Sequence, residues 1–346
     1  MNKNINNPII SIKHLAKSFG KKEVLKDINL DIYPGEVVSI IGSSGSGKST
    51  MLRCINRLED ATSGQILFND IDILDRKTDI NKLRQNIGMV FQSYALFPTM
   101  SVYENIAFGL KVKKMQKTEI DKQVKKVAEK IKISDAQLKK NVSELSGGQQ
   151  QRIALARAIV QEPKILCLDE PLSNLDAKLR ISLRSELKRL QRELGMTTLY
   201  VTHDQDEAMT LSDRIAVFNN GYVEQIGTPY EIYNHSATEF VCDFIGDINR
   251  LGSKTLSEIN KQTGANLDEK KTGFIRLERF ILEEKPNTAK LVGTMVEFEY
   301  SGMLAKYTLN VNGETVRIVE KNDGHKFFEK GQKMPFFVQP KDIMQY

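Results

Sequence analysis

The run Gly42-Ser43-Ser44-Gly45-Ser46-Gly47-Lys48-Ser49 constrains this chain more than any other feature of its sequence. It follows the apolar run from Val37 to Ile41, which is typical of a strand buried on both faces, and it precedes a predicted helix from Lys48 to Leu58. A glycine-rich turn in this position directs successive backbone N–H groups, and the positive end of the helix dipole, toward a phosphate. We therefore predict a phosphate-binding loop on an α/β sheet.

The polar side chains of this loop have the chemistry that a nucleoside triphosphate requires. Lys48 can reach the β- and γ-phosphates, and the Ser49 hydroxyl can ligate Mg²⁺. A flexible Ser/Gly turn is the alternative, but it does not account for the lysine, the spacing and the flanking elements together. The predicted nucleotide-binding residues of the loop are Gly42, Ser43, Gly45, Gly47, Lys48, Ser49 and Thr50.

Two carboxylates end a second apolar run, from Ile165 to Leu168. Side chains at the carboxyl end of a parallel strand lie where α/β proteins bind their ligands. We expect Asp169 to help hold Mg²⁺, usually through water, and Glu170 to orient and polarise an attacking water. A helix N-cap leading into Pro171 is the alternative interpretation of these two acids.

The order of predicted elements divides the chain into two domains. Strands alternate with helices up to residue 240, which implies a mostly parallel sheet covered on both sides. Apolar positions three and four apart among lysines indicate a helical subdomain inserted at about residues 93–160. Residues 241–346 contain β-like runs, and Asn312-Gly313 predicts a two-residue hairpin turn. The predicted fold is an α/β core with an inserted helical subdomain, followed by a small all-β domain.

Composition limits the class of protein and the compartment to which this fold can belong. The hydrophobic fraction of 40% and the charged fraction of 27% fit a globular protein. No apolar run approaches the roughly 20 residues that span a bilayer, and the first residues lack the apolar core of a signal peptide. Cys54, Cys167 and Cys242 give neither a disulfide framework nor a metal site, so we expect them buried in a reducing compartment. The net charge of +6 is spread among acidic residues, so we interpret it as solvated helix faces rather than a nucleic-acid site.

The string Leu145-Ser146-Gly147-Gly148-Gln149 resembles the signature of the ABC ATPases. The resemblance implies ATP hydrolysis with ATP and Mg²⁺ as cofactors, on a P-loop NTPase core. It also implies a head-to-tail dimer of two copies, in which the signature of one subunit covers the ATP held by the P-loop of the other. Glycine N–H groups at a helix N-terminus suit a γ-phosphate. The signature residues expected to contact nucleotide are Ser146, Gly147, Gly148 and Gln149.

Other residues resemble the same family in chain order. Phe19 resembles the aromatic residue that stacks on adenine, and Gln92 resembles the Q-loop glutamine that contacts Mg²⁺ and the attacking water. Asp176 resembles the D-loop carboxylate at the dimer interface, and His203 resembles the switch histidine that contacts the γ-phosphate. The resemblance thus implies a catalytic set of Glu170, His203 and Gln92 and a metal set of Ser49, Gln92 and Asp169.

Two regions resemble the importers within this family. The string from Tyr94 to Pro98 resembles part of the groove that receives a coupling helix from a membrane subunit. Residues 241–346 resemble the OB-like regulatory (TOBE) domain of importers for maltose, polyamines, sulfate and ferric iron, although Arg276-Leu277-Glu278 departs from the R-P-E of many members. The resemblance implies a peripheral protein on the cytoplasmic face of the membrane, bound to two integral-membrane permease subunits and indirectly to a solute-binding protein, with no nucleic-acid partner.

The transported solute is not encoded in an ATPase that never touches it. By resemblance we favour a polyamine or ferric iron, with sulfate or phosphonate as the alternatives. A soluble ABC ATPase of translation or DNA repair is the alternative class, but such proteins usually carry two cassettes or long coiled coils. This chain has one P-loop, one signature and no sustained heptads.

Overall fold

The computed structural model describes residues 7–322, 324 and 328–346, and it consists of two compact units, residues 1–234 and 235–346. Our prediction placed the boundary after residue 240. Helix α10 (Glu239–Phe244) belongs to the second unit. One reason is that the fully buried Arg276 donates from Nη1 to the carbonyls of Cys242, at 3.0 Å, and Ile245.

The first unit is built on a six-stranded sheet with the order β10-β9-β3-β8-β7-β6, in which β10 alone is antiparallel to its neighbour. Every residue of β3, β7 and β8 is buried, which explains their continuous apolar sequences. The predicted parallel sheet is therefore confirmed. Its strands are β3 (Val37–Gly42), β6 (Ile87–Val90), β7 (Ile165–Asp169), β8 (Thr197–Val201), β9 (Arg214–Asn219) and β10 (Tyr222–Gly227).

A second, antiparallel sheet with the order β2-β1-β4-β5 shares one hydrophobic core with the parallel sheet and with α1 (Lys48–Ile55). Leu25 of this sheet, Leu52 of α1 and Phe218 of β9 all belong to that core. Helix α1 ends before the predicted Leu58, and Arg57 just beyond it has a left-handed backbone with φ 55°. The strands of the second sheet are β1 (Ile10–Phe19), β2 (Lys22–Ile32), β4 (Ser63–Phe68) and β5 (Ile71–Asp72).

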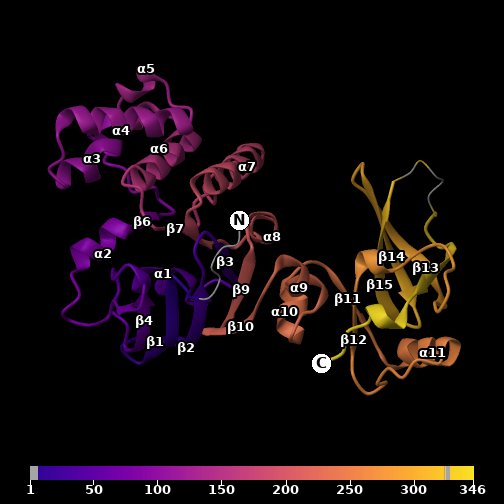
Figure 1. Ribbon diagram of the computed structural model, residues 1–346. Coiled ribbons are helices and arrows are strands. Elements are labelled where there is room, and N and C mark those ends of the chain that lie inside the picture. Colours follow the sequence, from indigo (N-terminus) through magenta and orange to yellow (C-terminus); the bar gives the residue numbers. More distant parts are fainter. Residues whose placement is uncertain (1–6, 323, 325–327) are drawn as a thin grey trace. The chain divides into compact units, whose positions relative to one another are not determined.

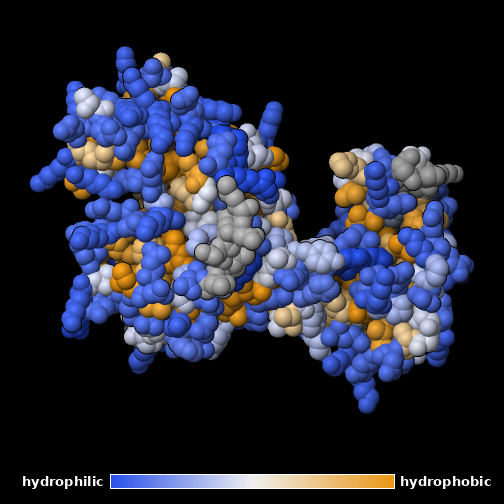
Figure 2. All heavy atoms as spheres, viewed as in Figure 1, coloured by the Kyte–Doolittle hydropathy of each residue, from blue (hydrophilic) through white to orange (hydrophobic). Residues whose placement is uncertain are grey.

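A group of helices between β6 and β7 forms a separate lobe of the first unit (Figure 1). Capping boxes at Ser101 and Ser146 fix where two of these helices begin. Helix α4 buries only its apolar stripe, and the visible face of the lobe is mostly hydrophilic in Figure 2. The helices are α3 (Val102–Val112), α4 (Lys117–Lys130), α5 (Asp135–Leu138), the 3-10 turn Val142–Glu144 and α6 (Gly147–Ile159).

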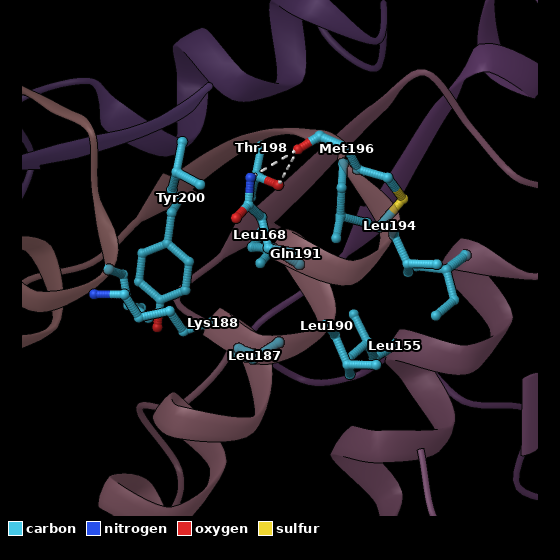
Figure 3. A pocket seen from close by; sticks show the side chains of 14 residues that line it. Leu155, Leu168, Leu187, Lys188, Leu190, Gln191, Leu194, Met196, Thr198 and Tyr200 are labelled. Carbon is cyan, nitrogen blue, oxygen red and sulfur yellow. Dashed lines mark hydrogen bonds between the residues drawn. The ribbon is translucent and has the colours of Figure 1, made fainter. Parts of the chain in front are cut away.

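Helix α7 (Ala177–Leu194) packs over β7 and β8 and leaves a small apolar cavity of about 30 Å³ (Figure 3). The polar lining residues Lys188, Gln191 and Thr198 donate to backbone carbonyls. The cavity therefore offers no chemistry for a nucleotide. The remaining helices of the first unit are α2 (Ile80–Asn86), α8 (Gln205–Leu211) and α9 (Pro229–Asn234).

The second unit contains an antiparallel sheet with the order β15-β14-β13-β16 and a separate β11-β12 pair. Asn312 and Gly313, with φ of 54° and 89°, join β14 and β15, so the predicted hairpin is confirmed. Helix α11 (Ser253–Thr263) was not predicted, because its buried stripe of Thr255, Leu256 and Ile259 is too short to give a clear helical period. The strands are β11 (Ile248–Leu251), β12 (Gly273–Arg276), β13 (Ala289–Tyr300), β14 (Leu304–Val311), β15 (Glu314–Lys321) and β16 (Lys333–Val338), and the 3-10 turns are Leu277–Arg279 and Pro340–Asp342.

Candidate functional site

The glycine-rich loop lies between the carboxyl end of β3 and the first turn of α1, as the sequence predicts. Gly42 and Gly47 have φ of 151° and 102°, which side-chain-bearing residues rarely adopt. A Cβ on Gly42 would lie 2.1 Å from the carbonyl oxygen of Phe218, and one on Gly47 would lie 2.8 Å from that of Val24. Close backbone packing therefore requires glycine at both positions, and the loop that results can wrap a phosphate chain.

Lys48 extends along this loop rather than into solvent. Its Nζ donates to the carbonyls of Gly42 at 3.0 Å and Ser43 at 2.9 Å. Burial lowers the pKa of Lys48, while the charges of Glu170 and Asp169 oppose that shift. The ammonium thus lies inside the loop that a phosphate would occupy, where few water molecules compete for it.

Ser49 and Asp169 meet between α1 and the end of β7. The Ser49 hydroxyl donates to Oδ1 of Asp169 at 2.6 Å, and Oδ2 of Asp169 lies 4.0 Å from the Arg53 guanidinium. Burial raises the pKa of Asp169, and the Ser49 hydrogen bond and the Arg53 charge partly offset that effect. A hydroxyl and a carboxylate are oxygen ligands of the kind that Mg²⁺ prefers, so this pair fits a magnesium ion beside the phosphates. Arg53 was not predicted, although its place one turn after Ser49 on α1 could have indicated it.

Three predicted catalytic residues meet beside this pair. Oε2 of Glu170 lies 3.3 Å from Nε2 of Gln92 and 3.3 Å from Nδ1 of His203. Glu170 has a left-handed backbone with φ 47°, and its N–H donates to the carbonyl of Val201 at 2.9 Å. Such strained residues persist where the surrounding structure fixes them, and they cluster at active sites.

His203 lies in a loop fixed by residues that the sequence analysis missed. Buried Glu207 accepts hydrogen bonds from Tyr200 Oη at 2.8 Å and Thr202 Oγ1 at 2.7 Å. The Asp204 N–H donates to Thr202 Oγ1 at 3.0 Å, and Asp204 in turn caps α8. Glu207 lies four residues after His203, in the first turn of α8, and an acid this close in sequence could have indicated a supporting role.

The signature residues begin helix α6. The Ser146 hydroxyl accepts from the Gln149 N–H, and Gln149 Oε1 accepts from the Ser146 N–H at 3.0 Å. A Cβ on Gly148 would lie 2.6 Å from Cδ2 of Leu179, so α7 packs closely at this point, while Gly147 is less restricted. Within residues 7–322, no recorded hydrogen bond or ion pair joins these residues to the glycine-rich loop.

Three further predicted residues have simpler surroundings. Asp176 caps α7 and accepts from the Leu179 N–H at 2.9 Å. Thr50 is half-buried in the first turn of α1. Phe19 ends β1 with 47% of its surface exposed, and Lys17 Nζ lies 4.5 Å from its ring centroid. An exposed aromatic ring of this kind is available for stacking.

A surface hollow of about 340 Å³ lies beside the Q-loop. Ala95 and Phe97 line it together with Phe91 and Phe108. Tyr94, by contrast, is buried in the core of the helical lobe, so only part of the predicted aromatic string faces the hollow. The hollow has apolar rings and two arginines, Arg84 and Arg157, and the Arg157 guanidinium lies 5.5 Å from the Phe97 ring centroid.

Other observations restrict the chemistry of the chain. Cys54, Cys167 and Cys242 are buried and free, as predicted. Across the part of the chain that the structure describes, no group of three or more His, Cys, Asp and Glu side chains could hold a metal ion. Within the same residues, no helix is long and apolar enough to cross a membrane.

Comparisons with known proteins agree with this geometry. A family model described as ABC transporter matches residues 25–173. A spermidine/putrescine import ATP-binding protein of Pasteurella multocida is 39% identical over 95% of this chain and 94% of its own length. An sn-glycerol-3-phosphate import ATP-binding protein of a Ruegeria species is 41% identical over 97% of this chain and 96% of its own length.

A solved structure extends the similarity to the fold. It is the dimeric structure of a post-hydrolysis state of an ATP-binding cassette with ADP and Pi, 35% identical, with a TM-score of 0.57 over 64% of this chain and 98% of that chain. The glycine-rich loop, the paired acids and the signature all lie in the region that these proteins share. The chain belongs to the ATP-binding subunits of ABC transporters and is an ATPase of the ABC type.

Proposed function

We propose that this subunit hydrolyses ATP to power the import of a small polar solute, and that its catalytic residues are Glu170, Gln92 and His203. The observation that carries this proposal is the cluster of these side chains beside the Ser49–Asp169 pair. Gln92, Glu170 and His203 lie in the loops after β6, β7 and β8, so only the folded sheet brings them together. The cluster lies at the carboxyl ends of β7 and β8, where α/β sheets bind ligands.

The arrangement assigns a task to each group. The loop N–H groups and Lys48 hold the β- and γ-phosphates, and Ser49, Asp169 and Gln92 hold Mg²⁺, which neutralises phosphate charge when bound. Glu170 orients and polarises the attacking water, with Gln92 and His203 within reach of its Oε2. His203 contacts the γ-phosphate, and the network around Glu207 fixes the loop that carries it.

We propose that two copies complete the site. Ser146 and the glycines after it begin helix α6, and within residues 7–322 no hydrogen bond joins them to the glycine-rich loop of their own subunit. Such a helix end suits the γ-phosphate of a facing subunit. The dimeric cassette among the similar structures supports this arrangement. Phe19 would stack on the adenine, and Asp176 would lie near the subunit boundary.

The hollow beside the Q-loop suits a membrane subunit. Its rings, Phe91, Phe97 and Phe108, resemble the aromatic anchors of protein interfaces. We propose that each copy receives a segment of one of two permease subunits there, which holds the ATPase at the cytoplasmic face. A solute-binding protein would act through the permeases, and nucleic acid has no part in the function.

For the solute we propose a polyamine. The spermidine/putrescine import protein that is similar to this chain over 95% of its length supports this choice. The resemblance favours ferric iron equally, but neither of the two similar import proteins is named for it. An uptake assay tests the choice: cells without this chain should lose uptake of labelled spermidine and regain it with the wild-type chain. Undiminished spermidine uptake in those cells would refute the polyamine but leave the ATPase unaffected.

The Glu170→Gln variant tests the catalytic proposal. The amide keeps the size of the side chain but is a far weaker base, so we expect turnover to fall about 10²-fold or more while ATP still binds. The trapped ATP should hold two copies together, which size-exclusion chromatography with ATP would detect. Turnover at the wild-type rate would refute the assignment of Glu170.

A further inference from the structure

Helix α6 does more than present the signature at its N-terminus. About three turns further along, Arg157 reaches the Q-loop and donates from Nη2 to the Tyr94 carbonyl at 2.9 Å and from Nη1 to the Ala95 carbonyl at 2.7 Å. A planar guanidinium can serve two successive carbonyls in this way, whereas an ammonium is a single point charge. Burial lowers the pKa of Arg157, and its guanidinium lies 5.5 Å from the Phe97 ring.

The turn that Arg157 holds is strained. Tyr94 and Ala95 both have left-handed backbones, with φ of 61° and 47°. Consecutive residues with a Cβ seldom adopt this conformation, because the Cβ crowds the following carbonyl oxygen. Such a turn persists only when neighbouring groups hold it. Arg157 binds the carbonyl of each strained residue, and the Tyr94 N–H donates to the Phe91 carbonyl at 2.8 Å.

The strained turn begins two residues after Gln92. On its other side, the Gln92 carbonyl accepts from Asn174 Nδ2 at 2.9 Å, and its side-chain amide lies 3.3 Å from Glu170. The position of Gln92 is therefore set by the D-loop through Asn174 and by the turn at Tyr94 and Ala95. A relaxed turn would move the Gln92 side chain relative to Glu170.

We propose that Arg157 is a positioning residue for ATP hydrolysis, because it clamps the strained Q-loop turn to the signature helix and so holds Gln92 against Glu170. This inference rests on the proposed roles of Gln92 and Glu170. The clamp also joins the part of the surface hollow formed by Ala95 and Phe97 to α6, since both residues and Arg157 line that hollow. If the residues that line the hollow shift, helix α6 and Gln92 would therefore move together.

The matched control is Arg189 of α7. Its Nη2 donates to the Lys130 carbonyl at 3.0 Å, which is an arginine-to-carbonyl bond from α7 to the end of α4, away from the Q-loop. The experiment measures kcat and KM for MgATP, and the thermal midpoint, of the full chain in the Arg157→Gln, Arg157→Lys and Arg189→Gln variants. We expect Arg157→Gln to lower kcat about tenfold or more with KM changed less than about twofold, and Arg157→Lys to fall between it and the wild type. Arg189→Gln should leave kcat within about twofold while it lowers the thermal midpoint.

An Ala95→Gly substitution separates positioning from general stabilisation. Glycine adopts the left-handed conformation without steric cost, so the turn needs the clamp less. We expect Ala95→Gly to restore part of the turnover lost in Arg157→Gln. The clamp is refuted if kcat falls equally in Arg157→Gln and Arg189→Gln, or if Ala95→Gly restores nothing.

Two further variants separate this inference from the proposed function. Gln92→Ala should lower kcat at least as far as Arg157→Gln. Wild-type turnover in Arg157→Gln beside inactive Gln92→Ala and Glu170→Gln variants would refute the clamp alone. Wild-type turnover in Glu170→Gln would refute the proposed catalytic function itself.

Discussion

Alanine at Gly42 should destabilise the first unit by a calculable amount. A Cβ there would lie 2.1 Å from the carbonyl oxygen of Phe218 and 2.9 Å from its carbon, where β3 and β9 pair in parallel. The two strands would have to separate by roughly 1 Å, because interiors are close-packed and such overlaps must be relieved. Overpacking costs about 1–3 kcal/mol and the backbone conformation, with φ 151°, about 1–3 kcal/mol more. We expect the free energy of unfolding to fall by about 2–6 kcal/mol.

Gly45→Ala is the control for this prediction. Gly45 has φ 76°, but a Cβ there would meet nothing within 4 Å, so only the backbone cost of about 1–2 kcal/mol applies. Thermal and urea unfolding of the full chain, followed by far-UV circular dichroism because the chain has no tryptophan, measures both losses. A loss in Gly42→Ala no larger than the loss in Gly45→Ala would contradict the steric argument.

Two further predictions concern buried carboxylates. Because burial raises the folded-state pKa of Asp169 above 3.8, its charge destabilises the nucleotide-free fold at neutral pH, and this penalty disappears as the pH falls through the folded-state pKa. Asp169→Asn should therefore raise the thermal midpoint of the nucleotide-free protein at pH 7, and this increase should shrink toward pH 4. The same variant should lose Mg²⁺-dependent turnover. A thermal midpoint unchanged at pH 7 would contradict the argument. Glu207→Ala should lower the free energy of unfolding by about 2–6 kcal/mol and also lower kcat, because the two buried hydroxyls of Tyr200 and Thr202 each lose their acceptor. Glu207→Gln keeps an acceptor oxygen and should cost less in urea unfolding, and equal losses in the two variants would show that the hydrogen bonds are not the cause.

The local sequence was sufficient to predict those features that depend on only a few neighbouring residues. The glycine-rich loop, the buried strand before it and the Asn312-Gly313 hairpin depend on backbone conformations and apolar runs of a few residues. The mostly parallel sheet followed from the alternation of strands and helices. Helix α11 was not predicted, because its one short buried stripe gives little periodic signal in the sequence.

The contacts that support the site could not be predicted from the sequence. Arg157 and the strained carbonyls that it binds are more than sixty positions apart along the chain, and no local pattern relates them. Glu207 lies close to His203 in sequence, but its role depends on a hydroxyl in β8 that only folding brings near. Asp176 also caps α7, a contact that the resemblance to the D-loop carboxylate did not indicate.

The sequence by itself therefore determined which chemical groups the protein offers to a nucleotide and in what order they occur. Loop conformation, strand burial and helix starts depend on neighbouring residues, and these are visible in the printed sequence. The tertiary structure alone decided that Glu170 meets Gln92 and His203 at 3.3 Å, and that an arginine of the signature helix holds the Q-loop. Those distances depend on the packing of strands and helices far apart in the chain, and packing of that kind is a property of the whole core.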